Sequence, residues 1–255
     1  MGWKQAFMFA GFISLVPLLT LFLVPRKFDR PIVDESQAPL SPKEIFSVFT
    51  QRKVLGIWLT SAFIETSQTG FTTFLPVAIA IIGGLGERTI LGLSVTGLYL
   101  AFTIVITSPG GLLGGRLGEK FAPEKIIAVL CLLPIPFLLW MGMTAGAVWL
   151  ALAAIIRIPF SAMSPLISTL IATRLPASTQ GKAFAISYSI GPIIASLAAL
   201  LAGAIAERHG LTWIFPLMAV FLVPASISAL LMIGSSKEHA KTRGSSSTPS
   251  PPISS

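Results

Sequence analysis

Long apolar runs separated by short polar tracts dominate the chain. Seven such runs can be read, and each reaches the length of roughly 20 residues that a helix needs to cross the hydrocarbon core of a membrane. Their boundaries are 5–24, 54–83, 89–114, 126–145, 147–173, 183–206 and 211–233. Helices are expected because backbone groups in lipid must pair within their own segment, whereas membrane strands would show short alternating runs. The pattern predicts an all-α membrane protein with seven transmembrane helices.

Composition agrees with the membrane class. Hydrophobic residues fill 53% of the 255 positions, charged residues fill only 11%, and the mean hydropathy is +0.83. A soluble domain needs more polar surface than this. The net charge of +8 does not indicate a nucleic-acid partner, because nearly all basic residues lie in the tracts between runs, where they set the topology. The expected partner of this surface is the lipid bilayer.

The basic residues are distributed unevenly between the two sides of the predicted membrane. Fourteen lysines and arginines fall in the tracts of one side and three in those of the other, while Arg157 lies inside a run. Because cytoplasmic loops carry the excess of Lys and Arg, we expect a multi-pass protein of the plasma membrane with its N-terminus outside and its C-terminus in the cytoplasm. Few residues precede the first run, so an outside N-terminus leads us to expect an upstream part.

The polar tracts divide the chain into four parts. Residues 1–24 are predicted as the first transmembrane helix, 25–53 as a cytoplasmic linker, 54–234 as a six-helix unit and 235–255 as a disordered cytoplasmic tail rich in Ser and Pro. The six runs of the central unit form two triplets, and because three is odd the second triplet must be inverted relative to the first. Inverted three-helix repeats are typical of secondary transporters, and the first helix is left over beside this six-helix half.

Two charged residues lie deep inside predicted spans. Glu65 is about 11 residues from the inner end of its run and Arg157 about 10 from the outer end of its own, so at about 1.5 Å per residue both lie roughly 15 Å deep. An unpaired charge at that depth costs at least ~2.5–3.5 kcal/mol. Each charge should therefore face a partner, a wet cavity or a ligand.

Polar residues accompany both charges at helical spacing, so that each charge belongs to a polar helix face. In one interpretation the hydroxyls only satisfy helix backbones, and Glu65 and Arg157 form a structural ion pair. In the other interpretation, the two faces bind a substrate or protons. The residues of this candidate site are Ser61, Glu65, Gln68, Thr69, Thr72, Arg157, Ser161 and Ser164.

Cofactor and metal chemistry is not expected. Cys131 is the only cysteine, and His209 and His239 both lie outside the runs, so no Cys- or His-based metal site fits within a span. The last run has no lysine for a retinal Schiff base, and P-loop and dinucleotide motifs are absent. The chain is therefore not predicted to be an enzyme. The alternative to a transporter is a non-transporting seven-span protein, either receptor-like or a regulatory or structural partner subunit.

A glycine-rich stretch covers the end of the 89–114 run and the tract behind it. It reads Gly-Gly-Leu-Leu-Gly-Gly-Arg-Leu-Gly-Glu-Lys over residues 110–120, and its small residues four apart permit close helix packing. The stretch resembles the loop signature Gly-x-x-x-Asp-Arg-x-Gly-Arg-Lys of the major facilitator superfamily. Gly115 and Glu119 depart from the signature, as in its degenerate copy between the eighth and ninth helices. The matching residues, which the resemblance implies form a gating loop, are Gly111, Arg116, Gly118 and Lys120.

Three further stretches extend the resemblance. Residues 174–183 resemble the polar loop before the eleventh helix, Gly191-Pro192 is similar to an element that antiporter members carry in the fifth helix, and residues 2–4 are similar to the Gly-Trp-Arg before the sixth. The resemblance implies helices six to twelve of a secondary active transporter, which moves a small-molecule substrate by alternating access. The deep position of Glu65 leads us to expect coupling to protons through this residue. The polar faces would otherwise meet lipid, so we also expect a complementary N-terminal half or self-association to cover them.

Overall fold

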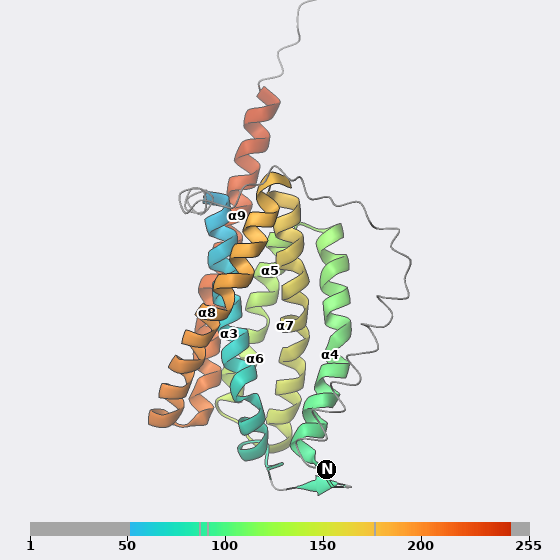
Figure 1. The fold of residues 1–255 in the computed structure, drawn as a ribbon, viewed down its shortest axis with the longest axis vertical. Helices are drawn as coiled ribbons and strands as arrows, with labels where there is room; N and C mark the ends of the chain where they lie inside the picture. The colour runs from blue at the N-terminus through green and yellow to red at the C-terminus, as the bar shows by residue number, and fades with distance from the viewer. Residues whose placement is uncertain (1–51, 87, 91, 176, 246–255) are drawn as a thin grey trace, which may run out of the picture.

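The computed structural model describes residues 52–86, 88–90, 92–175 and 177–245. The helix predicted at 1–24, most of the predicted linker and residues 246–255 of the predicted tail lie outside the described residues. Most of the described part is helical, and its helices run side by side as a bundle (Figure 1). The expectation of an all-helical membrane bundle is therefore met where the structure can be described.

The described bundle is built from α-helices, one 3-10 helix and one short strand pair. The strands β1 (Thr89–Ile90) and β2 (Leu93–Ser94) pair in antiparallel fashion directly before the helix that follows them. The 3-10 helix η1 (Leu211–Trp213) leads into the last helix. The α-helices are α3 (Arg52–Ile81), α4 (Val95–Lys120), α5 (Pro123–Leu132), α6 (Pro134–Met141), α7 (Gly146–Arg174), α8 (Ala177–His209) and α9 (Ile214–Ser245).

The helices α5 and α6 are two parts of one span. Proline lacks a backbone N–H and its ring clashes with the preceding turn, so Pro134 and Pro136 interrupt the helix at Leu133. Together the two parts cover Pro123–Met141, which is 19 residues long and apolar enough to cross a membrane. The run predicted as a single helix at 126–145 is thus a broken helix.

Five segments of the described chain are both long and apolar enough to cross a membrane. The helix α3 is also long, with 30 residues, but Glu65, Gln68 and several threonines make it less apolar than the other five. The prediction of several membrane helices is confirmed by these segments. The count of seven spans and the inverted-repeat arrangement stay predictions, because the first predicted span lies outside the described residues.

The helix α9 continues past its apolar part to Ser245, whereas the sequence leads us to expect a disordered tail from residue 235. Residues 235–245 contain no proline and include good helix formers such as Glu238, Ala240 and Lys241. A helix that is already formed adds further residues at little cost, because nucleation is the unfavourable step. The helical extension therefore follows from the membrane-spanning part of α9, and Pro249 is the first proline after it.

A cluster of buried aromatic rings ties α3, α7 and α9 together. Phe71 of α3 meets Phe160 of α7 and Phe215 of α9 edge-to-face, with ring centroids 5.5 and 6.1 Å apart. Trp149 of α7 contacts Phe215 in the same way at 5.2 Å. All four rings are buried, so the cluster forms a packed core rather than a lipid-facing surface.

Hydrogen bonds fix α3 against α9 in addition to this packing. The hydroxyls of Thr60 and Ser228 lie 2.7 Å apart, and the Ser67 hydroxyl donates to the backbone carbonyl of Met218 at 3.0 Å. Thr60 and Ser67 are buried and stand seven residues apart, so they lie on one face of α3. That face packs against α9, and the neighbouring face of α3 is available for other contacts.

Glycines allow α4 to approach α7 closely. α4 packs chiefly against α7 at one edge of the bundle (Figure 1). A methyl group added at Gly110 would overlap the Ser161 side chain and the Ile158 carbonyl, and one added at Gly114 would overlap the Ala162 backbone. The close packing predicted from the spacing of the small residues is therefore confirmed at these two glycines.

We predict that Gly114→Ala destabilises the protein by about 1–3 kcal/mol, because the added methyl group forces the two backbones apart. The matched control is Gly115→Ala, since a methyl group there meets nothing within 4 Å and is expected to be neutral or stabilising by up to about 1 kcal/mol. Unfolding can be followed through the thiol of buried Cys131, which reacts with a maleimide dye once the bundle opens. Equal stability of the two variants would contradict the close contact.

Candidate functional site

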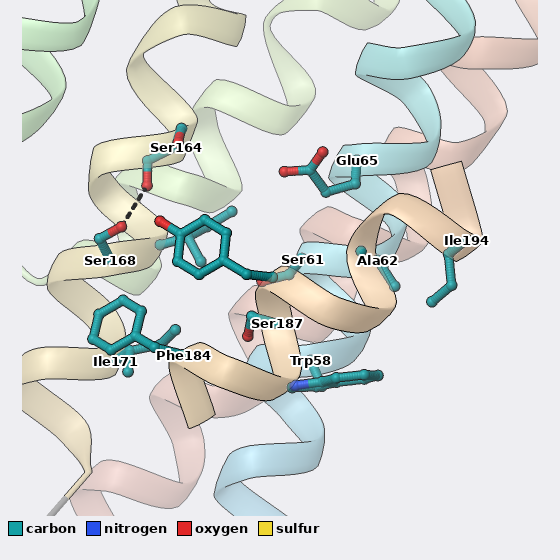
Figure 2. Close-up of a pocket in the computed structure, with 13 residues that line it drawn as sticks. Trp58, Ser61, Ala62, Glu65, Ser164, Ser168, Ile171, Phe184, Ser187 and Ile194 are labelled. Atoms are coloured by element: carbon teal, nitrogen blue, oxygen red, sulfur yellow. Dashed lines mark hydrogen bonds between the residues drawn. The ribbon is translucent and has the colours of Figure 1, made fainter. Parts of the chain in front are cut away.

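A cleft opens between α3, α7 and α8 (Figure 2). It is a half-open hollow whose interior holds about 70 Å³, and the rest of its space opens outward. Helix α3 contributes Trp58, Ser61, Ala62 and Glu65; helix α7 contributes Ser164, Ile167, Ser168 and Ile171; and helix α8 contributes Phe184, Ser187, Tyr188, Gly191 and Ile194. The cleft brings together three of the predicted site residues, namely Ser61, Glu65 and Ser164.

Glu65 is the only acidic residue among the described residues that line the cleft. Its side chain extends from α3 into the space that Ser164 and Ser168 border on the α7 side (Figure 2). The residue is half-buried, and its carboxylate has no ion pair or hydrogen bond with any residue that the structure describes. A carboxylate at membrane depth is costly without a partner, so this position is suited to a proton or a ligand.

Two serine hydroxyls in the cleft walls also lack partners. The oxygen atoms of Ser61 and Ser187 are buried, and neither has a hydrogen-bond partner within the described part of the chain. Ser168, by contrast, donates to the backbone carbonyl of Ser164 at 3.3 Å. A buried hydroxyl without a partner loses the hydrogen bonds that water gave it, so these two serines can accept or donate to a bound molecule after a rotation about χ1.

The other predicted residues of α3 lie outside the cleft lining. The Gln68 amide donates to the Phe160 carbonyl at 2.9 Å, and so it joins α3 to α7. The Thr72 hydroxyl donates to the carbonyl of Gln68 in its own helix at 2.8 Å, as the interpretation of backbone-satisfying hydroxyls predicts. Thr69 is half-buried. Gln68 therefore has a structural contact in this arrangement, whereas the exposed Thr72 continues the polar face of α3.

Arg157 stands apart from Glu65. The two residues form no ion pair among the described residues, and Arg157 does not line the cleft. Its buried Nε atom has no hydrogen-bond partner in the described chain, and Tyr99 of α4 lies close enough to interact with it electrostatically. Arg157 precedes Ser164 by seven residues, which places both on one stripe of α7 about 10 Å apart. The polar stripe of α7 thus runs from the cleft toward the other end of the helix.

Ser161 faces α4 rather than the cleft. Its hydroxyl lies 2.8 Å from the carbonyl of Thr107 in α4 and 2.8 Å from the carbonyl of Ile158 in its own helix. The sequence pattern places Ser161 on the polar face of α7 with Arg157, but the close approach of α4 covers that part of the face. The contact therefore assigns Ser161 to helix packing.

The predicted gating residues lie within the last turns of α4. Gly118 packs against Leu166 and Thr169 of α7. A methyl group added at Gly111 would be in ordinary van der Waals contact with the backbone oxygen of Ser161. Arg116 and Lys120 are exposed. α4 ends at Lys120, so the signature residues belong to a helix end rather than to a loop. A gating role for these four residues stays a prediction.

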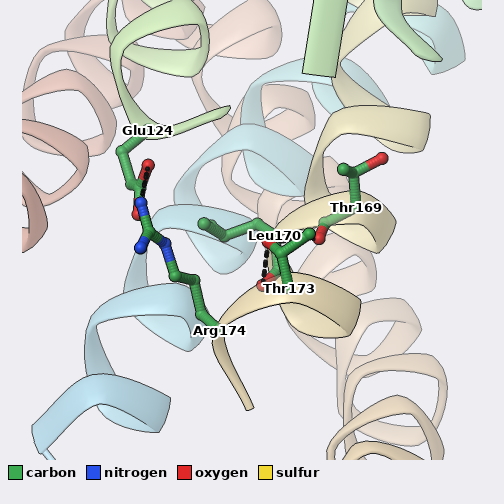
Figure 3. A network of polar contacts seen from close by, with 5 residues as sticks. All are labelled: Glu124, Thr169, Leu170, Thr173 and Arg174. Carbon is green, nitrogen blue, oxygen red and sulfur yellow. Dashed lines mark hydrogen bonds and ion pairs between the residues drawn. The ribbon is translucent and has the colours of Figure 1, made fainter. Parts of the chain in front are cut away.

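An ion pair that the sequence analysis missed joins α5 to α7 (Figure 3). The Arg174 Nε lies 2.5 Å from one carboxylate oxygen of Glu124, and its second nitrogen lies 3.1 Å from the other. Glu124 is only 3% exposed and stands in the first turn of α5, while Arg174 stands in the last turn of α7. Both charges thus complement the dipoles of their own helices, and these end positions are the signal by which the pair could have been found.

Comparisons with known proteins give a consistent result. Residues 1–160 match the family model described as Major Facilitator Superfamily. The chain is 25% identical over 229 residues to the multidrug resistance protein MdtG of Klebsiella pneumoniae (strain 342). This match covers 87% of the chain and 51% of MdtG. The crystal structure of the E. coli fucose:proton symporter FucP superposes with a TM-score of 0.61 and 20% identity, covering 78% of this chain and 48% of the symporter. The chain spans about half the length of both proteins.

We predict that Glu124→Gln destabilises the protein by about 1–3 kcal/mol, since Arg174 then loses its buried charged partner. The loss is smaller than for a fully buried pair, because the Arg174 side chain is 38% exposed. Glu119→Gln removes the same charge from an exposed position at the end of α4 and serves as the control. Unfolding in SDS, followed by circular dichroism, measures both, and an unchanged midpoint for Glu124→Gln would contradict a stabilising role.

Proposed function

Because the chain belongs to the Major Facilitator Superfamily, we propose that it forms part of a secondary active transporter that moves a small molecule by alternating access. The cleft between α3, α7 and α8 is the chain's contribution to the substrate path. The substrate binds at the cleft and the coupling ion is a proton. The protein acts in the plasma membrane, with the cytoplasmic ends of α4 and α7 on the side of the basic loops.

The observation that carries this proposal is the Glu65 carboxylate, which lines the cleft without a partner among the described residues. A structural carboxylate in a membrane bundle is expected to be paired, as Glu124 is with Arg174. An unpaired one is stable when it holds a proton, or when a ligand or water reaches it. Glu65 can therefore alternate between a protonated and an ionised state as the cleft opens to either side.

Arg157 and the remaining polar residues extend this site along the same wall. Arg157 shares its stripe of α7 with Ser164, and the exposed Thr72 shares its stripe of α3 with Glu65, seven residues away. The Glu65 carboxylate and the Arg157 guanidinium lie at different levels along the helices. A solute that passes along them can therefore interact with a charged group at more than one level. In this proposal Gln68 and Ser161 position α3 and α4 against α7, and Thr69 borders the wall between Glu65 and Thr72.

We further propose that a second half covers the open side of the cleft. Tyr188 is 71% exposed although it lines the cleft, and Ser164 is exposed as well. Left to lipid, these polar groups and Glu65 would be poorly accommodated. A complementary N-terminal half fits this need, since the chain spans about half the length of MdtG and of FucP, and self-association is the other way to cover the face.

Glu65→Gln is expected to abolish proton-coupled movement while leaving exchange or binding of the solute, because the amide keeps the shape but cannot carry a proton. The assay is the pH change inside proteoliposomes loaded with a pH-sensitive dye, when a panel of sugars, organic anions and organic cations is added to a transport-competent assembly. Glu119→Gln is the control. Wild-type coupling in the Glu65→Gln protein would remove Glu65 from the mechanism.

The purified 255-residue chain is expected to give no solute flux as a monomer, since alternating access needs two halves that rock around a shared site. Flux should appear when the chain is co-expressed with a complementary set of upstream helices, or when it dimerises. Flux from liposomes, together with the stoichiometry measured by single-molecule bleaching, decides between these outcomes. Robust flux by a demonstrated monomer would contradict the requirement for a second half.

A further inference from the structure

The cleft has a one-sided electrostatic character. Of the thirteen residues that line it in the described part of the chain, Glu65 is the only one with a carboxylate side chain, and none is basic. Four serines supply hydroxyl groups, and most of the other lining residues are apolar or aromatic. Arg157 lies outside the lining, about two helical turns along α7 from Ser164. The local field in the cleft is therefore set by one carboxylate, which attracts positive charge and repels negative charge.

Aromatic rings from two helices line the same cleft. Trp58 lines the cleft from α3, and Phe184 and Tyr188 line it from α8. The rings of Phe184 and Tyr188 stack, with centroids 6.3 Å apart and planes inclined by 15°. The faces of such rings carry partial negative charge and attract cations within about 6 Å of the ring centre. Because Tyr188 is 71% exposed, its ring is accessible to a molecule in the cleft.

From this juxtaposition we propose that the cleft binds an organic cation with a flat or aromatic apolar body. The positive charge pairs with the Glu65 carboxylate, and the apolar body packs on the Phe184 and Tyr188 rings. The unpartnered Ser61 and Ser187 hydroxyls accept or donate one hydrogen bond each to polar substituents. This assignment rests on the proposed function, in that it takes the cleft to be the place where the transported solute binds.

An organic anion fits the same cleft less well. Its charge would face Glu65, and the lining that the structure describes offers no lysine, arginine or histidine to compensate for the lost hydration. A neutral sugar fits poorly for a different reason. The described lining offers serine hydroxyls but no amide side chain, whereas several polar groups at fixed positions are the usual means of holding a polar solute.

The test compares two ions of nearly equal size and hydrophobicity, tetraphenylphosphonium and tetraphenylborate, which differ in the sign of their charge. The full chain is placed in lipid nanodiscs, each ion is titrated separately by calorimetry, and the binding to empty nanodiscs is subtracted. We expect tetraphenylphosphonium to bind at least about tenfold more tightly than tetraphenylborate, because the carboxylate favours the one and repels the other. This comparison needs no variant, so it stands even if a substitution impairs folding.

Two pairs of variants locate the binding. Glu65→Gln is expected to weaken tetraphenylphosphonium binding about tenfold and to strengthen tetraphenylborate binding, because the charge that attracts the one and repels the other is removed. Tyr188→Leu is expected to weaken tetraphenylphosphonium binding about three- to fivefold. Glu119→Gln and Phe102→Leu are the matched controls, because they change an exposed carboxylate and an exposed aromatic ring of α4 outside the cleft. The thiol reactivity of Cys131 shows whether each variant is folded.

Equal or tighter binding of tetraphenylborate, unchanged binding in folded Glu65→Gln protein, or binding of neither ion would each overturn the assignment of an organic cation. These results are distinguishable from failure of the proposed function. Proton-coupled flux of a sugar or an organic anion, lost in Glu65→Gln, would leave the transporter intact and reject only the cation. Conversely, Glu65-dependent binding of tetraphenylphosphonium without flux in any assembly would support the site and reject transport.

Discussion

The absence of water in a lipid interior is the constraint on which this structure depends, because every buried polar group must find a partner within the protein or in a ligand. Most hydroxyls of the bundle satisfy this requirement with a hydrogen bond to a backbone carbonyl of their own helix. Thr66 and Thr107, for example, donate to the carbonyl four residues earlier in their own helices, and Glu124 meets it through Arg174. Glu65 has no such partner within the described chain, and neither have the Ser61 and Ser187 hydroxyls. These unpaired groups make the space between three helices a candidate binding site.

The two faces of α3 explain how such an exception can be held in place. On one face, Thr60 and Ser67 bond to α9, and Phe71 packs into the aromatic cluster with Phe160 and Phe215. On the next face, Glu65 is directed into the cleft. A functional group is held precisely when the element that carries it is locked by packing and by hydrogen bonds behind it. The face of α3 that packs against α9 and the aromatic cluster therefore fixes the position of the face that carries Glu65.

Helical spacing was sufficient to predict which residues share a face, but not which neighbour that face meets. It placed Ser61, Glu65 and Ser164 on inward polar stripes, and all three line the cleft. It also grouped Gln68 and Ser161 with them, although these two bond to neighbouring helices, because rotation and separation of helices are set by packing. The pair of Glu124 and Arg174 escaped prediction because its members come from helix ends far apart in the sequence, where no periodic pattern connects them.

The separation of Glu65 from Arg157 has a mechanistic consequence. Had the two formed an ion pair, each would have neutralised the other in every conformation, and neither could respond to a proton or a solute. With no contact between them, the carboxylate of α3 has no fixed counter-ion within the described chain, and its charge can change when a proton or a solute reaches the cleft. A carboxylate tied to a guanidinium would first have to break that ion pair. The unpaired state of Glu65 therefore agrees with the proposed coupling between a proton and a solute.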